Sequence, residues 1–481
     1  MKISVFICTL AACIAFWADS ANAGQVIYVN NVSGKNHFPG TRKKPVATLR
    51  KGLELLKDGG RLEVINTGIA YSDPYPGVRG RMLLVKASGT ADNPVVINGN
   101  GAVYTGLAAV PAEYWKADGE NIYSVDFWPM ATHMRAFTKE NFWHDGTQIW
   151  FVNGQPGKNC HSLEELKATP YGFWWDKANK KARFHLPQGV KMEDTEIKLP
   201  ANMGFYVDGN YVRIENFYVV QSWNDGFDTI TDYRKGIHYL NCIAIDNCGQ
   251  GMSGHGGDVV YEDCAAIRCC ATGTSNVDKC NSIFIRCVFA GNNFGPGISM
   301  IGTGTHKFID CMIVDNTPDV LIHQHTLSKI IMENCLLRGN MDNPVIKMHN
   351  GTIKFKKCTI DGGTSLLTMI GSYSGKLYMQ DTLLINQKLN VFRLNGKAVE
   401  RIFLQNNRYV EPKTFIIAGK NYNSEEYFRA ASFDENSAVI SKNEAGKFGA
   451  ELPEKVTALY RKVIQLQADG NSKVFMKQEA Q

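Results

Sequence analysis

Two kinds of segment are missing from this chain of 481 residues. After residue 23, no apolar run approaches the ~18 residues that a transmembrane helix needs. The chain also has no block of Lys and Arg, and its net charge is only +6 with histidine neutral. Basic blocks are typical of proteins that bind nucleic acid. These absences argue against a membrane-spanning protein and a nucleic-acid partner, whereas a mildly basic chain suits an anionic substrate.

The first residues are typical of an exported protein. A single lysine, an apolar run and the small residues Ala21-Asn22-Ala23 predict a secretory signal peptide over 1–23. The mature protein would then begin at Gly24. The stretch Leu10–Cys13 also has the form of a bacterial lipoprotein box, so lipid anchoring at Cys13 is the alternative. We therefore expect a secreted or periplasmic protein.

Eleven cysteines follow residue 23, but most of them lack the spacing of a disulfide framework. Six begin similar phrases, such as NCIAIDN and DCMIVDN, at steps of 22, 23, 24, 24 and 23 residues: Cys242, Cys264, Cys287, Cys311, Cys335 and Cys358. The phrase at Asp381 keeps the period, with Thr382 in the cysteine position. Such a repeat predicts a solenoid whose coils stack on one another. We expect an all-β chain, a right-handed parallel β-helix, with these six cysteines as reduced thiols in its core.

Residues around the cysteines predict how one coil is built. An apolar residue stands two positions after each cysteine, so the two face the core together. An aromatic residue or methionine stands three before, and this odd step requires a corner or bulge. An amide file at a turn is expected from Asn247, Asn292, Asn316 and Asn340, each five after its cysteine. Any disulfide would come from the cysteines outside the ladder, which are Cys160, Cys248, Cys269, Cys270 and Cys280.

The segments on either side of the regular coils have other patterns. Residues 24–106 predict an N-terminal cap and the first coils, with a helix near Ala47–Leu56. Residues 107–200 hold six of the eight tryptophans, which predicts an inserted small β-domain with its own core or a set of sugar-stacking platforms. The regular coils fill 201–409. Two helical stretches in 410–481 are expected to close the other end.

Charged side chains and imidazoles gather along one strip of the predicted helix. Counting eleven or twelve residues from the cysteine positions stacks Asp228, Ser253, Ser275, Ser299, His323 and Lys347 on one line. Around this line stand Asp225, His255, Asp258, Asp278, Lys279, His325 and His349. Three glycines surround His255 in SGHGG and would let a substrate approach the backbone. The strip predicts a groove for an extended glycan, although polar turns without any site would give a similar pattern.

Two short motifs resemble those of known enzymes. The stretch YVNNVSGKNHFPGTRKKPVATL resembles the opening segment of secreted β-helix carbohydrate enzymes, and NDGFD at 224–228 resembles the calcium-binding stretch of family-nine polysaccharide lyases, which include pectate lyases. That family has DDGFD, so the resemblance implies Ca2+ held by Asn224, Asp225 and Asp228, with Asn224 offering a carbonyl oxygen. The lysine base of the family's next coil is replaced here by Ser253.

A second resemblance is to polygalacturonase-type hydrolases. Asn224-Asp225-Gly226 and Gly254-His255-Gly256 resemble their NTDG and GHG motifs, but the paired aspartates between these motifs and a later RIK are absent. Neither family's pattern is complete, so the reaction stays open at this point.

The sequence therefore predicts a polysaccharide-degrading enzyme with an anionic substrate, and three alternatives for its chemistry. In a uronate lyase, His255 would be the base beside calcium. In an inverting glycoside hydrolase, Asp228 and Asp278 would act together, since two coils separate them by ~10 Å. Lys279, His323 and His325 are further catalytic candidates. The third alternative is a glycan-binding or structural β-helix without catalysis.

Overall fold

The computed structural model describes residues 24–468, with gaps at 78–80, 128–149, 177, 293–296, 317–321, 325–326, 340–341, 349, 370–374, 389–390, 395–400, 418–419 and 432–433. The predicted signal peptide and lipoprotein box lie outside the described residues. So do His325, His349, Asn340 and two of the tryptophans, Trp128 and Trp143. No helix in the described part of the chain is long and apolar enough to cross a membrane.

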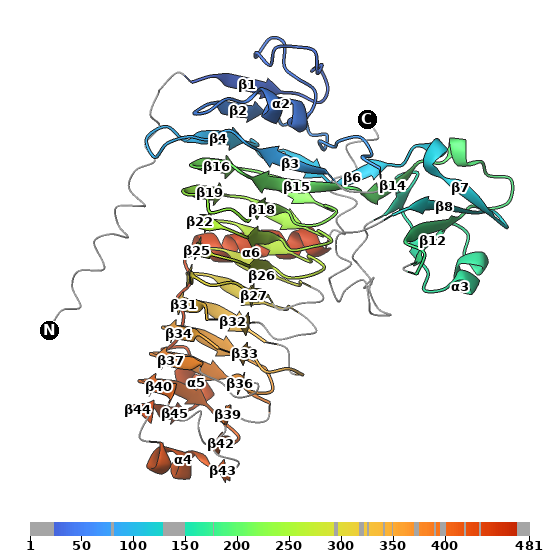
Figure 1. The fold of residues 1–481 in the computed structure, drawn as a ribbon. Coiled ribbons are helices and arrows are strands. Elements are labelled where there is room, and N and C mark those ends of the chain that lie inside the picture. Colours follow the sequence, from blue (N-terminus) through green and yellow to red (C-terminus); the bar gives the residue numbers. More distant parts are fainter. Residues whose placement is uncertain are drawn as a thin grey trace.

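Three long sheets wind into the predicted right-handed parallel β-helix (Figure 1). The 13-stranded sheet contains β1 (Val26–Val29), β2 (Arg61–Val64), β4 (Val95–Asn98), β16 (Val212–Glu215), β19 (Ile237–Leu240), β22 (Gly257–Glu262), β25 (Cys280–Ile285), β28 (Thr305–Ile309), β31 (Lys329–Glu333), β34 (Thr352–Lys356), β37 (Lys376–Gln380), β40 (Ile402–Gln405) and β44 (Asp434–Glu435). The 12-stranded sheet contains β3 (Arg81–Val85), β15 (Asn202–Val207), β18 (Phe227–Thr229), β21 (Met252–Gly254), β24 (Thr274–Asn276), β27 (Ile298–Met300), β30 (Ile322–Gln324), β33 (Ile346–Met348), β36 (Leu367–Met369), β39 (Phe392–Leu394), β42 (Phe415–Ile417) and β43 (Lys420–Tyr422). The 11-stranded sheet contains β5 (Val103–Thr105), β17 (Tyr218–Val220), β20 (Ile243–Ile245), β23 (Ala265–Ile267), β26 (Val288–Ala290), β29 (Met312–Val314), β32 (Leu336–Arg338), β35 (Thr359–Asp361), β38 (Leu383–Ile385), β41 (Arg408–Val410) and β45 (Ala438–Ile440).

The odd step between each aromatic residue and the following cysteine is explained by a corner, as predicted. The residue before the cysteine has a left-handed backbone, with φ of 51° at Asn241, 55° at Asp263 and 53° at Arg286. This single residue turns the chain from the 13-stranded into the 11-stranded sheet. The aromatic rings stack from coil to coil, and the centroids of Tyr261 and Phe284 lie 4.7 Å apart. The corner lets both the aromatic ring and the thiol face the core.

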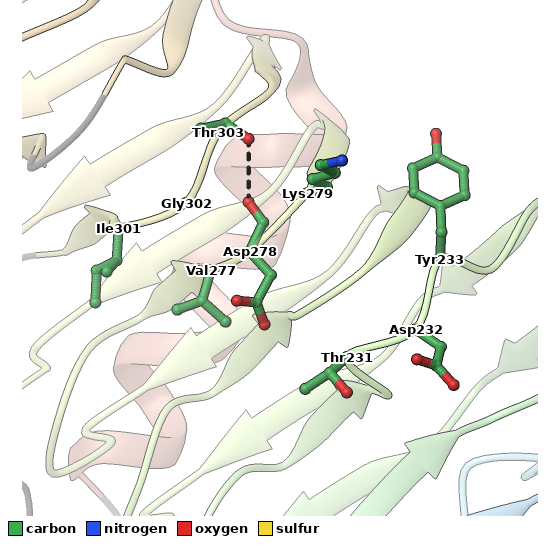
Figure 2. A pocket seen from close by; sticks show the side chains of 9 residues that line it. All are labelled: Thr231, Asp232, Tyr233, Val277, Asp278, Lys279, Ile301, Gly302 and Thr303. Carbon is green, nitrogen blue, oxygen red and sulfur yellow. Dashed lines mark hydrogen bonds between the residues drawn. The ribbon is translucent and has the colours of Figure 1, made fainter.

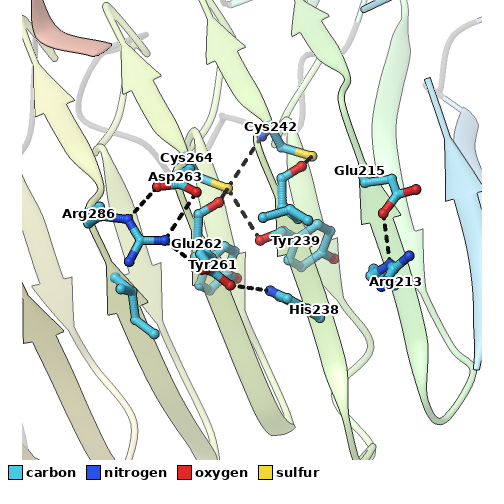
Figure 3. Close-up of polar contacts among 12 residues, drawn as sticks. Arg213, Glu215, His238, Tyr239, Cys242, Tyr261, Glu262, Asp263, Cys264 and Arg286 are labelled. Atoms are coloured by element: carbon cyan, nitrogen blue, oxygen red, sulfur yellow. Dashed lines mark hydrogen bonds and ion pairs between the residues drawn. The ribbon is translucent and has the colours of Figure 1, made fainter. Parts of the chain in front are cut away.

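The six ladder cysteines are buried and unpaired, which confirms their interpretation as reduced thiols in the core. Figure 3 shows two of them with the ion pairs on the outer face, such as Arg213 with Glu215. The Sγ of Cys264 lies 3.4 Å from the carbonyl oxygen of Tyr239 and 3.2 Å from that of Glu262. The thiols therefore find backbone acceptors at the corner. The five cysteines outside the ladder are also buried and free.

The predicted amide file is present, and the asparagine itself is not the left-handed residue of the turn. Asn292 donates from Nδ2 to Oδ1 of Asn316 at 2.8 Å, and the backbone N–H of Asn292 reaches the same oxygen at 3.0 Å. The left-handed residue is the one before the asparagine, such as Asp315 with φ of 56°. The amide side chain thus points into the core and satisfies backbone groups of the preceding coil, such as the carbonyl oxygen of Ala266, which accepts from Asn292.

The described residues from β6 (Leu107–Ala109) to β14 (Ile197–Pro200) form two small sheets beside the β-helix (Figure 1). The remaining elements are β7 (Lys116–Gly119), β8 (Ile122–Asp126), β9 (Phe151–Val152), β10 (Gln155–Pro156), β11 (Lys158–Asn159), β12 (Gly172–Asp176), β13 (Lys181–His185), the 3-10 helices η1 (Ala112–Tyr114) and η4 (Met192–Asp194), and α3 (Leu163–Ala168).

The four described tryptophans of this insertion build its core or pack against it. Trp115 and Trp150 are buried in one apolar cluster, and Trp175 packs against it. Trp174 packs at the edge of a smaller cluster around Cys160. The larger cluster, around Trp115 and Trp150, also includes Trp223, which directly precedes the motif NDGFD in the regular coils. The insertion therefore packs directly against the coil that carries this motif.

The two ends of the β-helix are closed by helices, with one departure from the expectation. At the N-terminal end lies α2 (Leu49–Leu55), and the Thr48 side chain caps it by accepting from the N–H of Lys51. At the other end α4 (Ser424–Ala430) places Tyr427 in the core. Near it lies α5 (Lys442–Ala445).

The last helix, α6 (Glu454–Ala468), was expected to close the C-terminal end, and this was wrong. It lies instead along the outer face of the 11-stranded sheet (Figure 1). Val456 and Val463 pack there on outward side chains such as Ile243 and Ile267. Those strands are apolar on both faces, so a covering helix removes their outer face from water.

Candidate active site

The motif NDGFD forms a tight turn that leads into β18. The Ser222 hydroxyl lies 2.7 Å from the carbonyl oxygen of Asn224 and 3.0 Å from that of Asp225, which holds the turn together. A Cβ at Gly226 would lie 2.7 Å from Nδ2 of Asn247 and 2.8 Å from the carbonyl oxygen of Gly251. The glycine is therefore required, because the next coil packs directly on this position.

Asp225, Asp228 and His255 form one compact cluster, with ligand atoms all within 4.8 Å of one another. The aspartates are 2% and 3% exposed, whereas the His255 side chain keeps 29% of its surface. Asp225 Oδ1 accepts the backbone N–H of Gln250 at 2.7 Å, and Asp228 Oδ1 accepts that of Thr229 at 2.6 Å. Buried carboxylates are thus presented beside a partly open imidazole.

His255 also connects the cluster to Asp278. Its Nε2 lies 3.6 Å from Oδ1 of Asp228, and its Nδ1 lies 3.9 Å from Oδ2 of Asp278. The backbone N–H of His255 donates to the Thr229 hydroxyl at 2.9 Å, which fixes the residue on its coil. One imidazole therefore stands between a buried and an exposed carboxylate.

Burial controls the protonation of these groups. It raises the pKa of Asp225 to about 7, partly offset by the N–H of Gln250. Burial and the neighbouring Asp225 charge raise the pKa of Asp228 well above its usual range. Burial lowers the pKa of His255, and the Asp278 charge opposes this. At neutral pH and without a cation, the two aspartates hold a proton between them and the imidazole is neutral.

The stacked strip predicted by counting is present in the 12-stranded sheet. Asp228 lies beside Tyr206 of the preceding coil, and Ser253, Ser275, Ser299, His323 and Lys347 follow in register. His323 belongs to the fourth strand after β18, about 19 Å along the stack at ~4.8 Å per strand. The structure therefore brings Asp225, Asp228, His255 and Asp278 together, but does not bring His323 to them.

An open pocket of about 770 Å³ adjoins this cluster (Figure 2). Its lining is Thr231, Asp232, Tyr233, Val277, Asp278, Lys279, Ile301, Gly302 and Thr303. Asp278 belongs both to the pocket and to the environment of His255. Lys279, a predicted catalytic candidate, also lines this pocket. Sequence reasoning missed Tyr233, whose only signal is an aromatic residue in a polar turn after Asp228.

Two of the glycines around His255 are required by packing within the chain. A Cβ at Gly256 would lie 2.5 Å from the carbonyl oxygen of Thr231, and one at Gly257 would lie 2.0 Å from that of Arg234. Gly257 also has a φ of 113°, which strongly favours glycine. These glycines make room for the loop 231–234, which gives them a role in packing, and the expected approach of a substrate to this backbone stays a prediction.

The residues of the turn fit a hard cation. Oδ1 of Asn224 is buried and has no hydrogen-bond partner. A Cβ at Gly249 would lie 2.4 Å from this oxygen and 2.4 Å from Oδ1 of Asp225, so the two oxygens are neighbours. Calcium prefers carboxylate and carbonyl oxygens. The donors of Asn224, Asp225 and Asp228 match that preference.

Comparison with known proteins identifies the fold. No protein family matches the chain, and no curated protein matches it. The solved structure of XylC with xylose aligns with a TM-score of 0.50 and 10% identity over 87% of this chain and 86% of that chain. Pectate lyase Pel9A aligns with a TM-score of 0.45 and 11% identity over 80% of each chain. Identities this low show the β-helix fold alone.

Proposed function

We propose that this protein is a secreted polysaccharide-degrading enzyme, a lyase that cleaves an acidic, uronate-containing glycan at the pocket beside His255. The observation that carries the proposal is the cluster of Asp225, Asp228 and His255, with ligand atoms within 4.8 Å, next to an open pocket. XylC was solved with xylose on this fold, which accords with a saccharide ligand.

A uronate lyase must remove the proton on C5, beside the substrate carboxylate. A cation held by Asn224, Asp225 and Asp228 would neutralise that carboxylate and acidify the proton. His255 accepts the proton at Nε2, because its lowered pKa keeps it neutral. Asp278 stabilises the charge that then develops near Nδ1, 3.9 Å away.

The remaining bond changes follow from this proton transfer. The electron pair of the C5–H bond forms the C4–C5 double bond, and the C4–O bond breaks with its pair on the leaving oxygen. That oxygen needs a proton, and Lys279 in the pocket lining is the group that supplies it. The products are a new chain end and an unsaturated uronate.

A product assay on pectins, alginate and neutral glycans tests the reaction. We expect absorbance in the unsaturated-uronate band on one acidic polymer, lost with a chelator and restored by Ca2+. New reducing ends without that absorbance would contradict the lyase. Absence of any product together with tight glycan binding would instead identify a non-catalytic β-helix.

Cation binding has a separate test that needs no turnover. We expect Ca2+ to raise the melting temperature of the wild type, because it binds only the folded site. The Asp225→Ala variant should show no such rise. An equal rise in both proteins would place the ion elsewhere.

An inverting hydrolase is the second candidate, and a distance favours it. Asp228 and Asp278 flank one imidazole ring at 3.6 and 3.9 Å, so their oxygens are less than about 10 Å apart. Inverting enzymes hold their two carboxyl groups ~6.5–9.5 Å apart. In that case Asp228 is the protonated acid and Asp278 the base, and cleavage proceeds in the presence of chelator.

A further inference from the structure

We infer that Tyr233 is a saccharide-stacking platform, fixed in place by Asp258 and Asn281, that holds one sugar unit of an acidic glycan in the pocket. This inference rests on the proposed function and deepens it, because it names a binding subsite beside the reacting group. The expected stacking residues, the insertion tryptophans within the described residues, are largely taken up by their own core.

Tyr233 is exposed but held in one orientation. Its side chain is 45% exposed and lines the pocket. Its hydroxyl donates to Oδ1 of Asp258 at 2.6 Å and accepts from Nδ2 of Asn281 at 3.4 Å. Asn281 also donates to Asp258 at 3.1 Å, and the two residues are in register on adjacent strands. Two successive coils therefore fix the ring before any ligand binds.

The loop that carries Tyr233 is equally well held. Arg234 pairs with Asp208 at 2.6 Å, and its carbonyl oxygen accepts the N–H of Asp258 at 2.9 Å. Gly256 and Gly257 leave the space for this loop. A ring on such a loop loses little freedom on binding, so more of its contact energy becomes affinity.

The position of the ring relates it to the proposed chemistry. Tyr233 stands across the pocket from Ile301, which is 44% exposed, with Asp278 and Lys279 between them (Figure 2). Sugar rings have apolar C–H faces that pack on aromatic and aliphatic surfaces. A sugar held by Tyr233 would place its carboxylate near Lys279 and its neighbour near His255.

Titration calorimetry with hexagalacturonate tests the platform without turnover, in the His255→Ala background. We expect Tyr233→Ala to weaken binding about tenfold. Tyr114→Ala is the matched control, since Tyr114 is also 45% exposed but lies in the insertion, and it should bind unchanged. Affinity within twofold of the parent for Tyr233→Ala overturns the inference, and so does a parent that does not bind hexagalacturonate.

A double-mutant cycle tests the role of Asp258 as a positioning residue. Tyr233→Phe keeps the ring but loses the anchor, so we expect about threefold weaker binding, and the same for Asp258→Ala. The double variant should be no weaker than either single variant; additive losses overturn the positioning role. If wild type binds hexagalacturonate through Tyr233 but never cleaves it, the platform stands and the lyase proposal fails.

Discussion

At the scale of single residues, Asp228 is a buried carboxyl group, which is costly for stability, and it belongs to the cluster with Asp225 and His255. We expect Asp228→Asn to lower turnover at least ~100-fold, as for loss of an acid, base or cation ligand. The melting temperature should hold or rise, because an amide keeps the bond from Thr229 without a buried charge. Turnover and differential scanning calorimetry measure the two effects, and unchanged turnover would remove Asp228 from the site.

Asp434 offers a matched control for that experiment. It is also buried with a raised pKa, but it accepts the hydroxyls of Tyr409 at 2.7 Å and Tyr427 at 2.9 Å near the C-terminal end. Asp434→Asn should therefore lower the melting temperature and leave specific activity unchanged. The opposite pattern in the two variants separates function from stability.

His255 gives the sharpest test of the chemistry. We expect His255→Ala to reduce the rate at least ~100-fold with folding intact, and His255→Gln to be equally poor, because glutamine cannot carry the proton. Steady-state kinetics and circular dichroism measure this. Near-normal turnover of either variant would exclude His255 as the base and direct attention to Lys279.

His306 connects a buried residue to the pH dependence of stability. It is fully buried, its Nδ1 lies 2.9 Å from the Ser282 hydroxyl, and burial lowers its pKa to about 4. The ring binds a proton near pH 6.5 in the unfolded chain but only near pH 4 in the folded protein. The stability that the neutral buried ring contributes is therefore complete above pH 6.5 and is lost as pH falls toward 4. Between pH 6.5 and pH 4, we expect the free energy of unfolding of His306→Asn, measured in urea, to fall by up to about 3 kcal/mol less than that of the wild type. Equal sensitivity would show that other groups control it.

At the scale of the elements, the thiol ladder makes a prediction about oxidation. All eleven cysteines of the described chain are free and buried. In the expected mature protein, which begins at Gly24, we expect no thiol to react with a labelling reagent in the native state, and eleven to react after denaturation without reductant. Pairing of most ladder cysteines in the denatured protein would mean that the register of the coils is wrong.

The sequence predicts the coils well because each coil meets the same constraints as its neighbours. The cysteine, the aromatic residue and the asparagine recur at fixed steps, so the core files follow from counting. The pocket does not follow in this way. Tyr233 reaches Asp258 and Asn281 across two coils, and no period in the sequence marks that contact. The cluster was predicted in part, since NDGFD and GHG are local motifs.

At the scale of the whole molecule, α6 is the element that the sequence could not place. Its amphipathic pattern fits an end cap as well as a sheet face, and only the outward apolar side chains of β20, β23 and β26 decide between them. We expect a chain ending at residue 452 to expose this face, to melt at a lower temperature and to aggregate. Light scattering and thermal melts would show it, and a soluble, equally stable truncation would contradict the role of α6.

The place of α6 also sets an order in time. A chain leaves the ribosome from its N-terminus, so β20 to β29 are made long before the helix that covers them. Until α6 has been made, any coils that have already folded carry a bare apolar face on the 11-stranded sheet. Closure of this face therefore waits for α6, and a copy that ends before residue 454 keeps an exposed apolar surface.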